Sequence, residues 1–376
     1  MDNNTYPKIF KIKSWCVVIH TLLFFIAINV IVAYFFNGSI ENELRFSSPA
    51  SFQEMYTIIN KIKHDKNKKV IFLGGSAMWG GRGIKEAKDS LPYQFKKFLK
   101  DDIEIYDLAY PAARPLDQLL LFSQIKDSAD LIIADINTVF LGDYYNEGVI
   151  EDYSKYIRTK ELLSAYTNDI IKQSPKTMQC LYDRNIKSTQ DYLVDATAWL
   201  PLLHYKDQIN RYLFGKQFSS LFANAINSVI DFLKFHKKIV WGSLLKPTVD
   251  VFDPQTNNQV SNEPIKKLQP TLNSCILGSF ATLVDEMNAP VIFYISPHST
   301  AITALQRKNP IYQENAQFVS RYIGKNILFN FDTEMTNLPP DVFVDEVHFN
   351  AKGHTELASM LAKKIKDLSE YTFLFK

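Results

Sequence analysis

A serine near one end of the chain and an Asp–His pair near the other have the residue types of an acyl-transfer site. Ser76 follows an apolar run and two glycines in VIFLGGS, and His348 ends the segment DEVH, which begins at Asp345. A serine hydroxyl is a weak nucleophile and needs a base to take its proton. His348 can be that base, and Asp345 is close enough on a turn to bind its other ring nitrogen and fix the tautomer. The sequence therefore predicts a Ser–His–Asp catalytic triad.

A tetrahedral intermediate on such a serine also needs hydrogen-bond donors for its oxyanion. Asn137 follows the apolar segment DLIIADI and offers a side-chain amide. The backbone N–H of Ser76, and one from the turn Ala109–Ala112, could supply two more. We therefore expect an oxyanion hole made of Ser76, Ala112 and Asn137, in a site that uses no cofactor and no metal ion.

Other interpretations of these residues stay open at this level. Ser76 could be a plain turn residue, because glycine and serine are common where strands end. The segment is not a Walker loop, since no Gly-Lys-Ser/Thr follows, and Met78 stands where a Gly-x-Ser-x-Gly elbow needs glycine. His298 and His354 are predicted to be structural or solvated. A zinc site made of His354 and the DEVH segment lacks a known ligand spacing.

The elements that must position these residues alternate between strands and helices. Strands are predicted at VIFLG, IEIYDLAY, DLIIADIN, PVIFYISP and NILFNFD, and helices at DSLPYQFKKFL, PLDQLLLFSQIKD, IYQENAQFVSRYIG and AKGHTELASMLAKKIKDL. This alternation predicts an α/β fold with three layers, in which helices cover both faces of a parallel sheet. Sites in such sheets form at the carboxyl ends of the strands, where Ser76 and Asn137 are expected. Between about residues 140 and 270 the alternation disappears, and we expect a mostly helical insertion.

An apolar run near the N-terminus predicts a membrane anchor. Trp15–Phe36 is uncharged and long enough to cross a bilayer, which takes about 20 residues. No small-x-small cleavage site closes the run, which favours an uncleaved anchor over a signal peptide. Lys8, Lys11 and Lys13 precede it, and the positive flank stays in the cytoplasm. We therefore expect a single-pass protein of the cell membrane whose catalytic part is extracytoplasmic, in a periplasm or on a cell surface.

These expectations divide the chain into four parts. They are a cytoplasmic tail (1–14), the transmembrane anchor (15–36), a linker with a helix (37–67), and a catalytic domain (68–376) that contains the insertion at about 140–270.

Composition adds two limits. The formal net charge of +2 gives no reason to expect a nucleic-acid partner. Of the three cysteines, Cys16 lies in the predicted anchor, while Cys180 and Cys275 would face an oxidising compartment. These last two could pair, or both could be free buried thiols.

The serine and the Asp–His pair also carry a family resemblance. The first block of the SGNH (GDSL-type) hydrolase superfamily, Gly-Asp-Ser with a later glycine, is matched here by Gly75-Ser76 with Gly80, although Gly75 occupies the place of the aspartate. The Asp-x-x-His block is intact from Asp345 to His348. The chain resembles this superfamily over both flanks, roughly residues 68–140 and 285–370. The resemblance implies a flavodoxin-like sheet and a serine nucleophile.

Two further blocks are present in reduced form. Ala112 in YPAAR stands where the family has a glycine that donates its N–H, and alanine keeps that N–H. The Gly-x-Asn-Asp block is reduced to Asp135–Thr138, which still contains Asn137.

A narrower resemblance follows from the order of the parts. The anchor, the early serine, the insertion, and YISP before a final Asp-x-x-His that is followed by Gly353 are similar to the membrane-anchored D-alanyl-transfer proteins of teichoic-acid assembly. This implies a serine O-acyltransferase that acts on a cell-envelope glycan through an acyl-serine intermediate. It also implies a partner, a polytopic membrane-bound O-acyltransferase. A carbohydrate esterase that removes acyl groups, or a non-catalytic envelope-assembly partner, are the alternatives.

Overall fold

The computed structural model describes residues 19–28, 30, 52–79, 84, 87–110, 113–141 and 267–376. They fall into two compact units, with residues 19–30 in one and the residues from 52 onwards in the other. Residues 19–28 are helical and expose apolar side chains such as Leu22 and Phe24. Within the described ranges, no helix has the length and apolar character that crossing a membrane requires. The rest of the predicted anchor, nearly all of the predicted insertion, and Ala112 lie outside the described residues.

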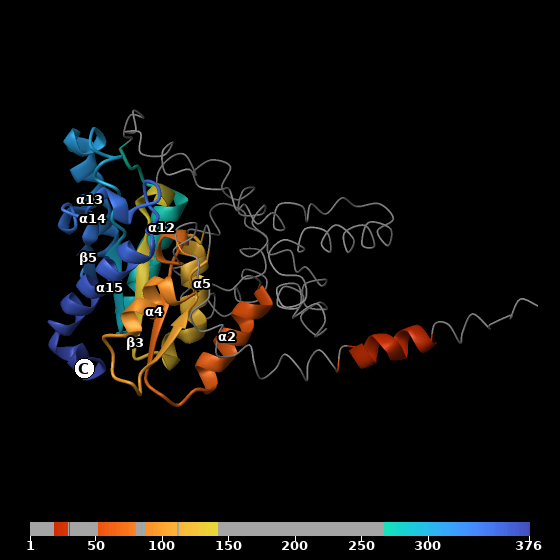
Figure 1. The fold of residues 1–376 in the computed structure, drawn as a ribbon. Helices are drawn as coiled ribbons and strands as arrows, with labels where there is room; N and C mark the ends of the chain where they lie inside the picture. Colours follow the sequence, from red (N-terminus) through yellow and green to blue (C-terminus); the bar gives the residue numbers. More distant parts are fainter. Residues whose placement is uncertain are drawn as a thin grey trace, which may run out of the picture. The chain divides into compact units, whose positions relative to one another are not determined.

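Five short strands of the described chain form one sheet in the order β2-β1-β3-β4-β5 (Figure 1). The strands are β1 Lys69–Leu73, β2 Glu104–Asp107, β3 Leu131–Ile136, β4 Val291–Ile295 and β5 Ile327–Asn330. Every neighbouring pair is parallel. This is the strand order of flavodoxin-like doubly wound sheets. The predicted α/β fold with a parallel sheet is therefore confirmed.

Helices cover both faces of this sheet (Figure 1). Their bounds are α2 Phe52–His64, α3 Ser76–Trp79, α4 Leu91–Lys96, α5 Pro115–Ile125, α12 Leu272–Glu286, α13 Pro310–Ile323, α14 Phe331–Glu334 and α15 Ala351–Lys366. On one face Phe95 of α4 packs edge-on against Phe72 of β1, with ring centroids 5.5 Å apart. On the other face Phe280 of α12 packs against Phe293 of β4 at 5.2 Å. The sheet is thus the middle layer of three.

The sequence explains why this layer is buried. The residues of β1, β3 and β4 are buried along their whole length, as expected for parallel strands that are covered on both sides. Alternate strand residues such as Phe72 and Ile133 pack on α4 and α15 in one hydrophobic cluster. Because both faces are apolar, the polar groups of these strands collect where the strands end.

Among the elements that differ from the sequence prediction are α12 and β5. The helix α12 was not predicted, although Thr271 caps it by accepting a hydrogen bond from the Ser274 N–H at 3.1 Å. The last predicted strand, NILFNFD, stops at Asn330, whose side chain accepts from the Thr333 N–H and so starts the short helix α14. Cys275, in α12, is disulfide-bonded, so it is not a free thiol.

A buried carboxyl group at the end of β2 predicts a pH-dependent stability. Asp107 is fully buried; its Oδ1 accepts the Ala109 N–H at 2.8 Å, while Oδ2 has no partner among the described residues. Burial raises the pKa of Asp107 to about 8. The native state therefore holds a proton that the unfolded chain releases near pH 4, so stability falls as the pH rises from about 4 to about 8, by at most about 6 kcal/mol.

We expect the neutral substitution Asp107→Asn to remove most of this dependence. The variant should unfold at a higher denaturant concentration than the wild type at pH 8 and at a similar one at pH 5. Denaturant titrations at the two pH values measure the effect. The exposed Asp127→Asn variant is the control and should follow the wild type. Equal destabilisation of Asp107→Asn at both pH values would contradict the prediction.

Candidate active site

Ser76 lies where β1 ends and the short helix α3 begins. Gly74 makes this exit possible: a Cβ there would lie 2.8 Å from the Asp135 Cβ and about 3 Å from Met78, so only glycine fits between the ends of β1 and β3. Ser76 itself is half-buried, and its N–H is one of the first in α3, which have no intrahelical acceptor. Gly74 thus allows close packing of β1 against β3 beneath the half-buried Ser76.

The Asp–His pair lies on a closed loop that precedes α15. Phe343 and Phe349 pair as an antiparallel bridge at the base of this loop, and their rings stack at 4.4 Å. Across the loop, the Val344 N–H donates to the His348 carbonyl at 2.9 Å. Gly353, in the first turn of α15, packs directly under the loop, since a Cβ there would lie 2.6 Å from the Val342 carbonyl oxygen. The loop is therefore fixed at both ends.

The structure brings Ser76, His348 and Asp345 together. The Ser76 Oγ lies 2.8 Å from His348 Nε2, and Asp345 Oδ2 lies 2.7 Å from His348 Nδ1. The other carboxylate oxygen of Asp345, Oδ1, accepts the backbone N–H groups of Val347 and His348 at 2.9 and 2.8 Å. This is the arrangement in which a serine is activated by a histidine that a carboxylate orients.

The electrostatics of the loop are consistent with an ionised Asp345. Burial alone would raise its pKa, but hydrogen bonds from His348 and from the two backbone N–H groups hold the pKa of Asp345 below its usual value. An ionised carboxylate accepts hydrogen bonds only, so His348 Nδ1 carries the proton. Nε2 then has a lone pair that can accept the hydrogen bond, and later the proton, of the Ser76 hydroxyl.

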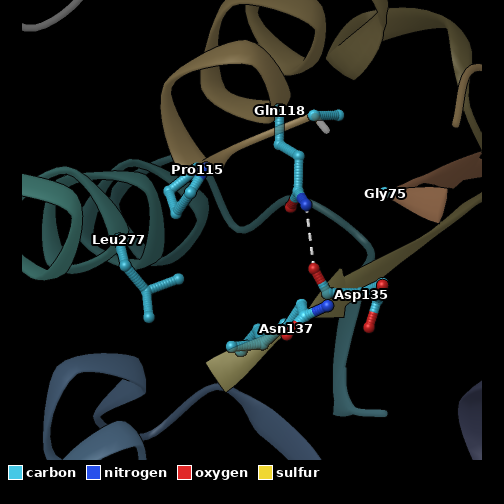
Figure 2. Close-up of a pocket in the computed structure, with 8 residues that line it drawn as sticks. Gly75, Pro115, Gln118, Asp135, Asn137 and Leu277 are labelled. Carbon is cyan, nitrogen blue, oxygen red and sulfur yellow. Dashed lines mark hydrogen bonds between the residues drawn. The ribbon is translucent and has the colours of Figure 1, made fainter. Parts of the chain in front are cut away.

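Asn137 lies directly after β3, beside a small cavity at the carboxyl edge of the sheet. The cavity measures ≈ 10 Å³, room for about one water molecule, and both Gly75 and Asn137 line it. Figure 2 shows Gln118 of α5 pointing across to the backbone of Asp135, where its amide donates to the carbonyl at 2.8 Å. This contact fixes the end of β3, and with it Asn137, next to the turn that carries Ser76.

Asp135 supports the same turn from below. It is buried, and the Ser296 hydroxyl donates to its Oδ1 at 2.5 Å. Burial raises the pKa of Asp135 to about 6, while hydrogen bonds from Ser296 and from the Gly75 N–H act in the opposite direction. A carboxyl group is therefore present beneath Gly75, although it comes from β3 rather than from position 75.

The remaining histidines occupy different environments. His354 is fully buried against the Phe349 ring, and neither ring nitrogen has a partner among the described residues. Burial lowers the pKa of His354 to about 3, so the ring is neutral near pH 7. His298 instead contacts a buried carboxylate, Asp332, to which sequence analysis assigned no role. The signal for that pair was weak, because the two residues are far apart in the chain.

Comparisons with known proteins add little to this picture. No family model matches the chain, and no curated protein matches it either. Among solved structures, it is similar to a lipase/acylhydrolase from Enterococcus faecalis, with 12% sequence identity and a TM-score of 0.36, over 80% of this chain and 96% of that chain. A similarity this distant supports neither a family assignment nor a substrate.

Proposed function

We propose that this protein is an extracytoplasmic serine O-acyltransferase that acts on a cell-envelope glycan through an acyl-serine intermediate. The observation that carries the proposal is the 2.8 Å contact of the Ser76 Oγ with His348 Nε2, in a ring whose other nitrogen is held by Asp345. The half-buried hydroxyl at the carboxyl edge of the sheet supports the same conclusion, because a substrate can reach it there.

In the first half of the reaction, Ser76 takes the acyl group. His348 Nε2 accepts the hydroxyl proton as Oγ attacks the acyl carbonyl, and Asp345 stabilises the imidazolium that results. The oxyanion of the tetrahedral intermediate accepts hydrogen bonds from the Ser76 N–H and the Asn137 side chain, with Ala112 proposed as the third donor. His348 then protonates the leaving group as the carbon–oxygen bond to it breaks.

In the second half, an acceptor hydroxyl takes the place of the leaving group. His348 removes the proton of this hydroxyl while its oxygen attacks the acyl-serine carbonyl, and the proton returns to the Ser76 Oγ as the ester bond breaks. If water enters instead, the same steps release the free acid. Transfer and hydrolysis therefore share one triad, and they differ only in which hydroxyl group is held near the ester.

The proposed location explains the proposed partner. The apolar run from Trp15 and the disulfide at Cys275 support a domain outside the cytoplasm. Acyl-CoA, the common donor, is cytoplasmic. A polytopic membrane-bound O-acyltransferase that delivers the acyl group across the bilayer is therefore part of the proposal.

The proposed oxyanion hole predicts the effect of removing Asn137. Asn137→Ala should lower the turnover of small soluble esters by about 10²–10³-fold with little change in KM, as expected when one oxyanion donor is lost. Steady-state kinetics of the purified full-length chain test this. Asn67→Ala is the matched control, because Asn67 is exposed and precedes β1 at the amino ends of the strands. A folded Asn137→Ala variant with wild-type turnover would remove Asn137 from the site.

A comparison in cells tests transfer against the alternatives. We expect fewer ester-linked acyl groups on envelope polymers both in cells that lack the protein and in cells that carry Ser76→Ala. Immunoblotting checks that the Ser76→Ala variant is present in the same amount as the wild-type protein. An increase of acyl groups in both strains points instead to a deacylating esterase. If the acyl groups decrease in the deletion strain but not in the Ser76→Ala strain, the protein is a non-catalytic assembly partner.

A further inference from the structure

A second histidine–carboxylate pair lies at the same edge of the sheet as the triad. His298 follows β4, and its Nδ1 lies 3.0 Å from Asp332 Oδ1, the residue after the start of α14. The backbone N–H of His298 donates to the same oxygen at 2.9 Å. Both side chains are buried, with 7% of each residue exposed. The pair therefore has the carboxylate–imidazole half of a triad, and within the described ranges the His298 ring makes no hydrogen bond to a serine.

Asp332 is held in its ionised form by two further side chains. Arg307 Nη2 donates to Oδ1 at 2.7 Å, and the Tyr312 hydroxyl donates to Oδ2 at 2.5 Å. Burial alone would raise the pKa of Asp332, but its contacts with His298, Arg307 and Tyr312 hold it below its usual value. His298 Nδ1 is therefore the donor in its contact with Asp332, which fixes the ring. His298 Nε2 has no hydrogen-bond partner among the described residues and is available to a ligand.

This pair is joined to the catalytic loop through Glu346. The Ser299 N–H donates to the Glu346 backbone carbonyl at 2.8 Å. This hydrogen bond connects the segment after β4 to the turn between Asp345 and His348. The Glu346 side chain is half-buried and makes no hydrogen bond to any described residue. Because Ser299 directly follows His298, its contact with Glu346 places that residue beside the His298 segment. Burial acts to lower the pKa of His298, but Asp332 and the charge of Glu346 raise it above its usual value.

The proposed reaction leaves both side chains unused. A carboxylate accepts hydrogen bonds, and an imidazole with one fixed nitrogen accepts or donates at the other, so together they match neighbouring hydroxyl groups of a sugar. Groups that hold the acceptor favour its attack over that of water. Building on the proposed function, we propose that His298 Nε2 and the Glu346 carboxylate bind the hydroxyl-bearing sugar acceptor beside the Ser76 ester.

The test separates transfer from hydrolysis in one assay. The full-length chain is incubated with p-nitrophenyl acetate and a panel of methyl glycosides of glucose, galactose and N-acetylglucosamine, and acetylated glycoside and free acetate are quantified. In His298→Asn the amide nitrogen replaces Nδ1, so the Asp332 contact is kept while Nε2 is lost. We expect the ratio of acetylated glycoside to acetate to fall by about tenfold or more in His298→Asn and in Glu346→Gln. His64→Asn, on the exposed end of α2, should keep the wild-type ratio.

A parallel fall of transfer and hydrolysis in both variants would overturn the proposal, because it indicates a purely structural role. An unchanged ratio would overturn it as well. If the wild type acetylates none of the glycosides, their binding to Ser76→Ala is measured by saturation-transfer NMR. Binding that is lost when His298→Asn is added supports the acceptor site, and no binding of any glycoside refutes it.

The same assay tests the proposed function separately. If Ser76→Ala releases p-nitrophenol at the wild-type rate while glycosides still bind at His298, the catalytic proposal fails and the sugar site stands.

Discussion

Replacing Ser76 by alanine is expected to lower the turnover of small soluble esters by about 10⁴-fold or more. The hydroxyl that forms the acyl-enzyme is lost, and His348 Nε2 loses the group it contacts at 2.8 Å. Because the members of a triad act as one unit, His348→Ala should cost about as much, and the double variant should be little worse than either single one. Steady-state kinetics of the three purified variants measure this.

The control for Ser76→Ala is Ser320→Ala, which removes an exposed hydroxyl from α13 and should leave turnover at the wild-type level. Mass spectrometry of the protein after a brief exposure to p-nitrophenyl acetate gives a second readout, since only a chain with Ser76 should gain one acetyl group at that position. If the fold-decrease in turnover of the double variant equals the product of the two single decreases, Ser76 and His348 act independently. The proposed triad would then be refuted.

The second large effect is expected for Asp345→Asn, which should lower turnover by about 10⁴-fold while the site keeps its shape. The two backbone N–H groups that donate to Oδ1 of Asp345 would keep the asparagine oxygen on their side, which turns its NH₂ group toward His348 Nδ1. An NH₂ group favours a ring protonated on Nε2, and that tautomer cannot accept the Ser76 proton.

The pH dependence distinguishes this effect from a loss of folding. Asp345→Asn should recover part of its activity at alkaline pH, where hydroxide replaces the missing base, and its denaturant midpoint should stay near that of the wild type. Asp341→Asn is the control, because Asp341 lies just before the same loop and its exposed carboxylate pairs with Lys352 on the surface. Wild-type turnover in Asp345→Asn would show that the carboxylate does not orient His348.

Local patterns predicted those parts of the site that depend on neighbours in the chain. The contact of Asp345 with His348 spans three residues, so a single turn was enough to predict it. Gly74 and Gly75 follow β1 directly in the sequence, so the end of that strand could also be predicted from its neighbours in the chain. The helix α12 could also have been predicted, since its capping residue and its apolar positions are local, but it follows directly after a stretch in which the alternation of strands and helices is lost.

The sequence alone determined the α/β class, the buried strands and the order of Ser76, Asp345 and His348 along the chain. Only the tertiary structure decided that Ser76 and His348, which are 272 positions apart, lie in contact. It also decided that His298 meets Asp332, because β4 and β5 pair in parallel with Ile295 beside Asn330. The physical reason is that strands buried on both faces are apolar throughout, so their pattern specifies neither their neighbours nor their register, and the polar groups at their ends meet only when the whole sheet is packed.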